Sequence, residues 1–114
     1  MLDFWASWCA PCIRSLPKLV SLVGTFPEDK VKLIAVNEEE LPFTIHQFLA
    51  PRDLDMTVGV DVDAAIGRKF GVTALPQTVI VGPNGKIARV FVGAPADLHA
   101  SIQRTIQELL PPSD

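Results

Sequence analysis

Short apolar runs recur along the chain, separated by stretches of mixed polarity. The runs at Leu2–Trp5 and at residues 31–36 predict buried strands, and a weaker signal at residues 56–60 predicts a third strand. Two later runs, at residues 78–81 and at Ile87–Val92, are joined through a Pro-Asn-Gly sequence that is typical of a tight turn. We therefore expect the last two strands to form an antiparallel hairpin.

Between these strands, apolar residues recur at three- and four-residue spacing, the pattern of amphipathic helices. It predicts helices at about Ala10–Gly24 and at about residues 41–49, 62–70 and 98–110. Pro51, Gly71 and the pair Pro111 and Pro112 supply stops for the last three helices. This order of strands and helices predicts an α/β fold in which helices cover both faces of a mixed sheet.

Length and charge exclude several classes of function. With 114 residues, 48% of them hydrophobic, the chain is sized for a single domain over residues 1–114. No run of like charge is longer than Glu38, Glu39 and Glu40, so we expect no nucleic-acid partner. No apolar run approaches the roughly 18 residues of a membrane span, so we expect no membrane contact by this chain.

The beginning of the chain shows no targeting segment. Met1 leads directly into the first apolar run, without the charged region and cleavage site of a signal peptide. Because Cys9 follows so soon, the sequence resembles a piece cut from a longer precursor. Any membrane tether is therefore expected upstream of Met1.

Both cysteines lie in the stretch WASWCAPC, at the start of the first predicted helix. Such a pair can be redox-active, hold half of a metal site, form a structural disulfide or remain idle. A metal site needs about four ligands, and the two histidines, His46 and His99, are not spaced as a ligand pair. Free N–H groups and the helix dipole favour a thiolate at Cys9, and Cys12 follows one turn later. We therefore predict dithiol redox chemistry, with no metal and no cofactor.

Two segments of the sequence resemble the thioredoxin superfamily. LDFWASWCAPC, residues 2–12, is similar to its active-site segment, and FGVTALPQT, residues 70–78, is similar to its loop with a proline after a cis peptide bond. The first segment and the extra helix at residues 41–49 resemble the extracytoplasmic TlpA-like branch, which includes membrane-tethered reductases of cytochrome c maturation. The likeness covers about residues 2–92. It implies a three-layer α/β/α thioredoxin fold with an inserted helix, N-terminally truncated because the family's usual first strand or strands and first helix are missing.

The resemblance implies catalytic roles for three residues. Cys9 is the attacking thiol, Cys12 the resolving thiol, and Asp3 stands where thioredoxins carry a buried aspartate that relays a proton. The TlpA-like branch more often has asparagine at that position, and Asp3 could instead be a solvated residue at a frayed strand end. In similar reductases an acid near Glu40 points toward the active site, which makes Glu40 a candidate modulator. The alternative for Glu40 is an acid favoured by the dipole of the next helix.

Three further residues are candidates for substrate binding. The resemblance implies that Trp8 forms a flat rim beside Cys9 and that Pro76 leaves the backbone of Leu75 free to pair with a substrate strand. The plainer interpretations are a core aromatic for Trp8 and an ordinary turn proline for Pro76, since only about one X–Pro bond in twenty is cis.

The residues between the cysteines bear on the direction of the reaction. Ala10 and Pro11 supply no charged or imidazole group to stabilise the reduced thiolate, so the disulfide form is comparatively stable. We therefore predict a reductase of protein disulfides that is supplied by an upstream thiol electron donor. The alternatives are a disulfide oxidant or isomerase and, from another class, a redox-silent binding module. We also expect a monomer in a periplasmic or other extracytoplasmic location, which the resemblance implies.

Overall fold

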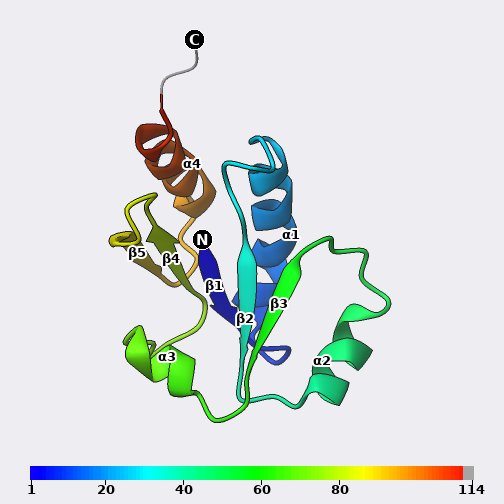
Figure 1. The fold of residues 1–114 in the computed structure, drawn as a ribbon. Coiled ribbons are helices and arrows are strands. Elements are labelled where there is room, and N and C mark those ends of the chain that lie inside the picture. Colours follow the sequence, from blue (N-terminus) through cyan, green and yellow to red (C-terminus); the bar gives the residue numbers. More distant parts are fainter. Residues whose placement is uncertain (112–114) are drawn as a thin grey trace.

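The computed structural model describes residues 1–111, whose five strands form one mixed sheet between two layers of helices (Figure 1). The strands are β1 (Leu2–Trp5), β2 (Ile34–Glu38), β3 (Thr57–Asp61), β4 (Gln77–Val81) and β5 (Ile87–Val92). Their order in the sheet is β3-β2-β1-β4-β5. The first three strands are parallel, whereas β4 is antiparallel to both β1 and β5. The predicted mixed sheet and its C-terminal hairpin are thus confirmed.

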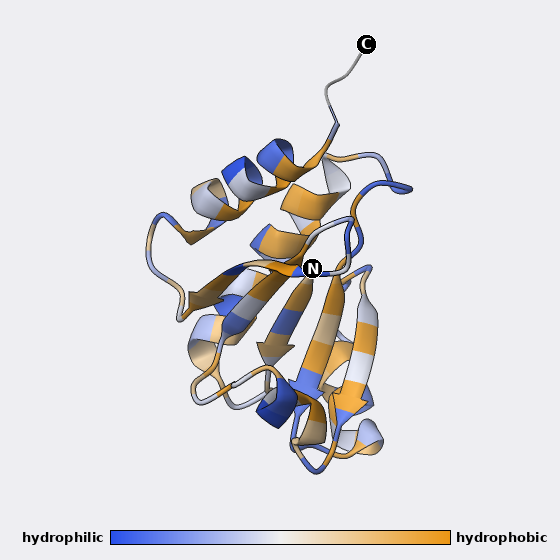
Figure 2. Ribbon diagram, turned by 60° about the vertical axis from the view of Figure 1, so that its left-hand side comes forward, coloured by the Kyte–Doolittle hydropathy of each residue, from blue (hydrophilic) through white to orange (hydrophobic). Residues whose placement is uncertain are grey.

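The helices are α1 (Ala10–Gly24), α2 (Pro42–Leu49), α3 (Ala65–Lys69) and α4 (Leu98–Leu109). One layer contains α1 and α4, where Leu19, Ile80 and Ile102 form a shared apolar core. The inserted helix α2 joins the same layer, because its Ile45 packs in a cluster with Leu16 of α1. Apolar residues recur at helical spacing among the polar residues of α4, as expected of an amphipathic helix (Figure 2).

The alternation of side chains along β1 sends successive residues to opposite layers. Trp5 packs with Cys12 on the face that α1 covers, whereas Phe4 packs with Val79 and Phe70 on the face that α3 covers. Asp3, two residues before Trp5, shares the α1 face. Strand β1 therefore connects directly to the cysteines and also places a carboxyl group beneath their helix.

The largest differences from the sequence prediction are the starts of β2 and α3. Strand β2 begins at Ile34 rather than at residue 31, because pairing starts where Leu2 of β1 and Thr57 of β3 lie opposite it. The apolar residues at 31 and 33 instead pack into the core between α1 and α4. Helix α3 begins at Ala65 rather than near residue 62, because the chain first turns around Asp61.

The C-terminal helix agrees with its prediction to within one residue. Helix α4 ends at Leu109, and Leu110 is its C-cap. Of the two expected stop residues, Pro112 lies outside the described residues. Over residues 1–111, no helix combines the length and apolar character needed to cross a membrane.

Candidate active site

Cys9 and Cys12 are joined by a disulfide at the N-terminus of α1. Their Cα atoms lie 5.3 Å apart, an ordinary separation for a disulfide. Cys9 is the N-cap residue of α1, and its Sγ accepts a 3.3 Å hydrogen bond from the backbone N–H of Cys12. Cys9 is 4% exposed and Cys12 is fully buried. After reduction, the same N–H and the helix dipole would favour a thiolate at Cys9 over one at Cys12.

The local sequence explains how this turn forms. The N–H of Cys9 donates a 3.1 Å hydrogen bond to the carbonyl of Ala6, which closes a tight turn between β1 and α1. Pro11 occupies the first turn of the helix, where its missing N–H leaves no intrahelical bond unmade. Trp5 and Leu16 pack behind the disulfide and anchor the turn to the core.

Asp3 is buried, with 1% of its surface exposed. Its Oδ1 accepts a 2.9 Å hydrogen bond from the hydroxyl of Thr78, and its Oδ2 has no hydrogen-bond partner within residues 1–111. Burial raises the pKa of Asp3 to about 7, although the bond from Thr78 opposes the shift. Near neutral pH this carboxyl can therefore exist in both protonation states, which proton transfer requires. The alternative of a solvated side chain does not agree with this burial.

Glu40 is held against the loop that precedes Cys9. Its carboxylate accepts a 2.7 Å hydrogen bond from the backbone N–H of Ser7, a further bond from the Ser7 hydroxyl and a 2.8 Å bond from the side-chain amide of Asn37. Burial alone would raise the pKa of Glu40, but these hydrogen bonds outweigh it and lower the pKa from its ordinary value. Glu40 therefore stays ionised and fixes the Ser7 loop.

Trp8 and Leu75 line one groove beside the disulfide, with a volume of about 220 Å³. Trp8 is 71% exposed, so it is not a core aromatic. The peptide bond between Leu75 and Pro76 is cis, as the resemblance implied. Leu75 also packs against the cluster that contains the two cysteines. Outside the helices and strands of residues 1–111, no backbone hydrogen bond involves Leu75, so its N–H and carbonyl can pair with another chain.

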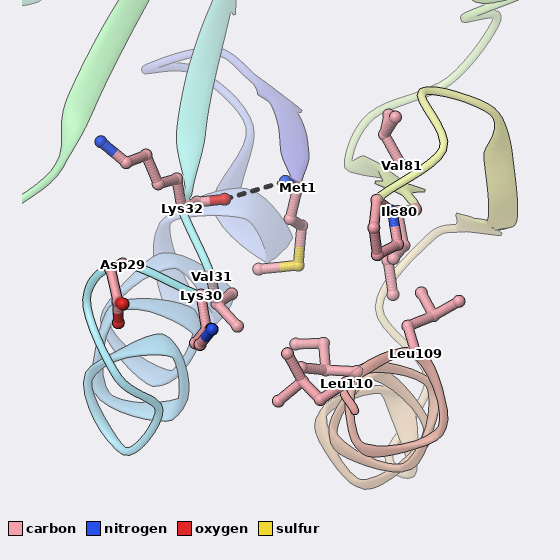
Figure 3. A pocket seen from close by; sticks show the side chains of 12 residues that line it. Met1, Asp29, Lys30, Val31, Lys32, Ile80, Val81, Leu109 and Leu110 are labelled. Atoms are coloured by element: carbon pink, nitrogen blue, oxygen red, sulfur yellow. Dashed lines mark hydrogen bonds between the residues drawn. The ribbon is translucent and has the colours of Figure 1, made fainter. Parts of the chain in front are cut away.

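A larger cavity, of about 330 Å³, lies at the opposite end of the sheet (Figure 3). Met1, Ile80, Leu109 and Leu110 contribute apolar side chains to its lining. The cavity contains no cysteine or histidine among its lining residues. The larger cavity is therefore separate from the groove beside the disulfide.

The two histidines lie on α2 and α4 rather than in the turn that holds the cysteines. His46 is an exposed residue in the last turn of α2. His99 of α4 contacts the hydroxyl of Ser15, with 3.1 Å between Nε2 and Oγ, and so links α4 to α1. No group of three or more potential metal ligands occurs in the described part of the chain.

Several polar partners of the candidate residues were not identified from the sequence. Thr78 bonds Asp3, whereas Ser7 and Asn37 both bond Glu40. Thr78 and Asn37 are fully buried. The sequence signal that could have identified Thr78 and Asn37 is a polar residue inside an otherwise apolar strand.

Comparison with known proteins agrees with this site. A sequence profile of the AhpC/TSA family matches residues 1–90, which include both cysteines and the cis-proline loop. The chain belongs to the AhpC/TSA family. The predicted thioredoxin superfamily, thioredoxin fold and TlpA-like resemblance are thereby confirmed.

Two curated relatives of this AhpC/TSA family chain are named thiol-disulfide oxidoreductase ResA. The protein from Halalkalibacterium halodurans is 32% identical over 92 residues, which cover 81% of this chain and 52% of the relative. The protein from Bacillus subtilis is 30% identical over 92 residues, which cover 81% of this chain and 51% of the relative. The chain thus spans about half the length of these relatives.

A solved structure shows the same fold. The crystal structure of a Chlorobium tepidum protein, described as a thiol:disulfide interchange protein DsbE, superposes with a TM-score of 0.89 and 29% sequence identity. The match covers 96% of this chain and 78% of that chain.

Proposed function

We propose that residues 1–114 form one thioredoxin-like domain, which reduces disulfides in other proteins as a thiol:disulfide oxidoreductase. The observation that supports this most strongly is the Cys9–Cys12 disulfide at a helix N-terminus, beside a groove lined by Trp8 and Leu75. The names of the ResA relatives support the same activity.

The reaction begins from the reduced dithiol. The Cys9 thiolate attacks one sulfur of the substrate disulfide, the substrate S–S bond breaks, and the departing sulfur takes up a proton. Cys9 is then joined to the substrate in a mixed disulfide. Cys12 passes its proton to the Asp3 carboxylate and attacks the Cys9 sulfur, so that the bond between Cys9 and the substrate breaks. The second substrate sulfur leaves as a thiolate and takes up a proton, and Asp3 returns its proton to the solvent. Two electrons move from the dithiol to the substrate, and an upstream thiol donor restores the dithiol.

The shape of the groove indicates which kind of substrate can bind. Trp8 offers a flat apolar surface beside Cys9, and the free backbone of Leu75 can hydrogen-bond an extended substrate segment. A polypeptide disulfide therefore fits the site better than a small compact one.

The reductive direction follows from the surroundings of the cysteines. Ala10 and Pro11 add no positive charge beside Cys9 that would stabilise its thiolate. An oxidant or isomerase role would require a more strongly stabilised thiolate. A redox-silent binding module would not require the two thiols. The proposal includes a monomer in the periplasm or another extracytoplasmic location.

Insulin reduction tests the activity. In the presence of dithiothreitol as donor, the wild-type chain should accelerate the reduction and precipitation of insulin well above the rate with donor alone. Cys9→Ser should return the rate to that background. A wild-type rate equal to the background would reject the proposed function.

A further inference from the structure

Two buried acids face each other at the ends of β2 and β3, on the opposite side of the sheet from Asp3. Glu38 and Asp61 are paired in the strand register and are 6% and 3% exposed. Their carboxyl groups lie within hydrogen-bonding reach of each other. Two carboxylates in such contact do not both ionise readily, because their charges repel and burial penalises each of them. The pair therefore holds one proton at neutral pH.

The hydrogen bonds around the pair place this proton on Glu38. Asp61 accepts bonds from the backbone N–H groups of Ile66 (3.0 Å) and Gly67 (2.8 Å). Burial would raise the pKa of Asp61, but these bonds, the bond from Glu38 and the charge of Arg68 outweigh burial and lower it. Glu38 Oε1 has no partner within residues 1–111.

The same surroundings act in the opposite direction on Glu38. Burial, the contact with Asp61 and the charge of Glu39 raise the pKa of Glu38 to about 8, and Arg68 only partly opposes them. Asp61, Glu39 and Arg68 are the charged groups that face this carboxyl. Glu38 is therefore the proton donor and Asp61 the ionised acceptor.

The Glu38 carboxyl also supports one wall of the substrate groove. A Cβ atom added at Gly67 would lie only 2.8 Å from Glu38 Oε1. The Glu38 carboxyl therefore packs closely against this glycine of α3. The carbonyl of Gly67 accepts a 2.8 Å hydrogen bond from the N–H of Val72, where the segment that leads to Leu75 begins. Glu38, Gly67, Val72 and Leu75 all line the groove together with Trp8.

We propose that Glu38 is a positioning residue for the groove: the proton that it shares with Asp61 keeps α3 and the segment from Val72 to Leu75 against β2. Loss of this proton leaves two adjacent carboxylates, whose repulsion is relieved when α3 moves away from the strand. Substrate binding then weakens while the Cys9–Cys12 chemistry is unchanged. This inference rests on the proposed function, because it assigns the groove to the substrate.

The pH dependence of insulin reduction tests this role, with the wild type and two variants compared at each pH. Glu38→Gln keeps the size and a hydrogen-bond donor toward Asp61 but does not titrate. Glu108→Gln makes the same change at an exposed acid of α4 that does not line the groove, and it is the matched control. Comparing the proteins at the same pH removes the effects of pH on the donor thiol and on Cys9.

The expected change is in KM. At pH 9, about one pH unit above the pKa of Glu38, only about a tenth of the wild-type molecules would keep the shared proton, so apparent KM should rise by up to about 10-fold relative to Glu38→Gln. At pH 7 the two proteins should have similar KM values, and kcat should stay similar throughout. Glu108→Gln should follow the wild type. A ratio of KM between wild type and Glu38→Gln that stays constant from pH 7 to 9 would overturn the proposal.

A second measurement does not depend on enzymatic activity or on the folding of a variant. In the oxidised wild-type protein, the amide NMR signal of Gly67 should titrate with a midpoint near pH 8, because this N–H donates to Asp61 and the Glu38 carboxyl rests on the same glycine. No titration between pH 6 and 10 would refute the shared proton. If insulin is not reduced at any pH while Gly67 does titrate, the proposed function and the role in substrate binding are wrong, and the shared proton stands.

Discussion

The two ends of the central sheet bury different kinds of side chain. Toward the disulfide, the strands bury polar groups such as Asn37, Glu38 and Asp61. At the other end, under α4, most buried residues are apolar, as at Ile80 and Ile106, with Thr105 as a polar exception. The larger cavity belongs to the apolar end, yet the disulfide and the groove lie at the polar end. Buried polar groups reduce stability unless they are well bonded, so their concentration at one end indicates function more directly than cavity volume does.

The largest effect should come from the polar end, with Asp3→Asn. The variant keeps the size of the side chain but cannot accept the proton of Cys12, so resolution of the mixed disulfide should slow by about 10²-fold. The first attack by Cys9 should remain near the wild-type rate. Stopped-flow measurements of both steps from pH 6 to 8 would check this, and two unchanged steps would make Asp3 a bystander.

The same variant should change how stability depends on pH. Burial raises the pKa of Asp3 to about 7, so between about pH 4 and 7 the folded protein retains a proton that the unfolded chain loses. The wild type should therefore lose stability as the pH rises through this window, and Asp3→Asn should not. We expect the variant to be more stable by about 1–3 kcal/mol at pH 8, with a smaller difference at pH 5. Urea unfolding at the two pH values measures both differences.

A pair of variants, one at each end, should separate binding from stability. Trp8→Ala should raise KM for insulin by about 10-fold, because an exposed aromatic beside Cys9 is lost, and should change stability by less than about 0.5 kcal/mol. Ile106→Val, at the cavity of the apolar end, should reduce the free energy of unfolding by about 1 kcal/mol and leave KM unchanged. If Ile106→Val altered KM as much as Trp8→Ala, the functional distinction between the two ends would fail.

An effect on stability similar to that of Ile106→Val should come from Glu40→Gln. The charged hydrogen bonds to Ser7 and Asn37 would become neutral ones, so stability at pH 7 should fall by about 1 kcal/mol. Because the folded-state pKa of Glu40 is lowered, this contribution is present above its unfolded value of 4.5 and is lost as the pH falls through the folded value. Unfolding curves at pH 7 and pH 3 check the sign. If the wild type and Glu40→Gln differed equally in stability at pH 7 and at pH 3, the charge of Glu40 would not be the cause of the difference.

The sequence predicted the elements well where local pattern decides structure. Helix α1 and strand β5 have the expected bounds, because helical spacing and a turn sequence define them. The start of β2 was wrong, because the apolar run does not show where β1 and β3 begin to pair. The start of α3 depends on backbone bonds to Asp61, which the spacing of apolar positions does not reveal.

In the candidate site, too, local motifs were predicted from the sequence and long-range contacts were not. The cysteines and the proline loop were predicted from contiguous motifs, and the structure brings Cys9, Trp8 and Leu75 to one end of the fold. The contact of Thr78 with Asp3 joins residues 75 positions apart, and the pairing of Glu38 with Asp61 depends on strand register. Such long-range partners follow from the folded arrangement, so the sequence pattern did not identify them.

The most direct test of the central claim, that Cys9 attacks protein disulfides and Cys12 resolves the product, is capture of the mixed disulfide. Reduced Cys12→Ser, mixed with insulin and analysed by intact-mass and peptide mass spectrometry, should accumulate an adduct linked through Cys9, because no thiol remains to release it. Reduced Cys9→Ser should form far less adduct under the same conditions, since Cys12 is fully buried. Equal capture by the two variants, or no adduct with Cys12→Ser, would contradict the account.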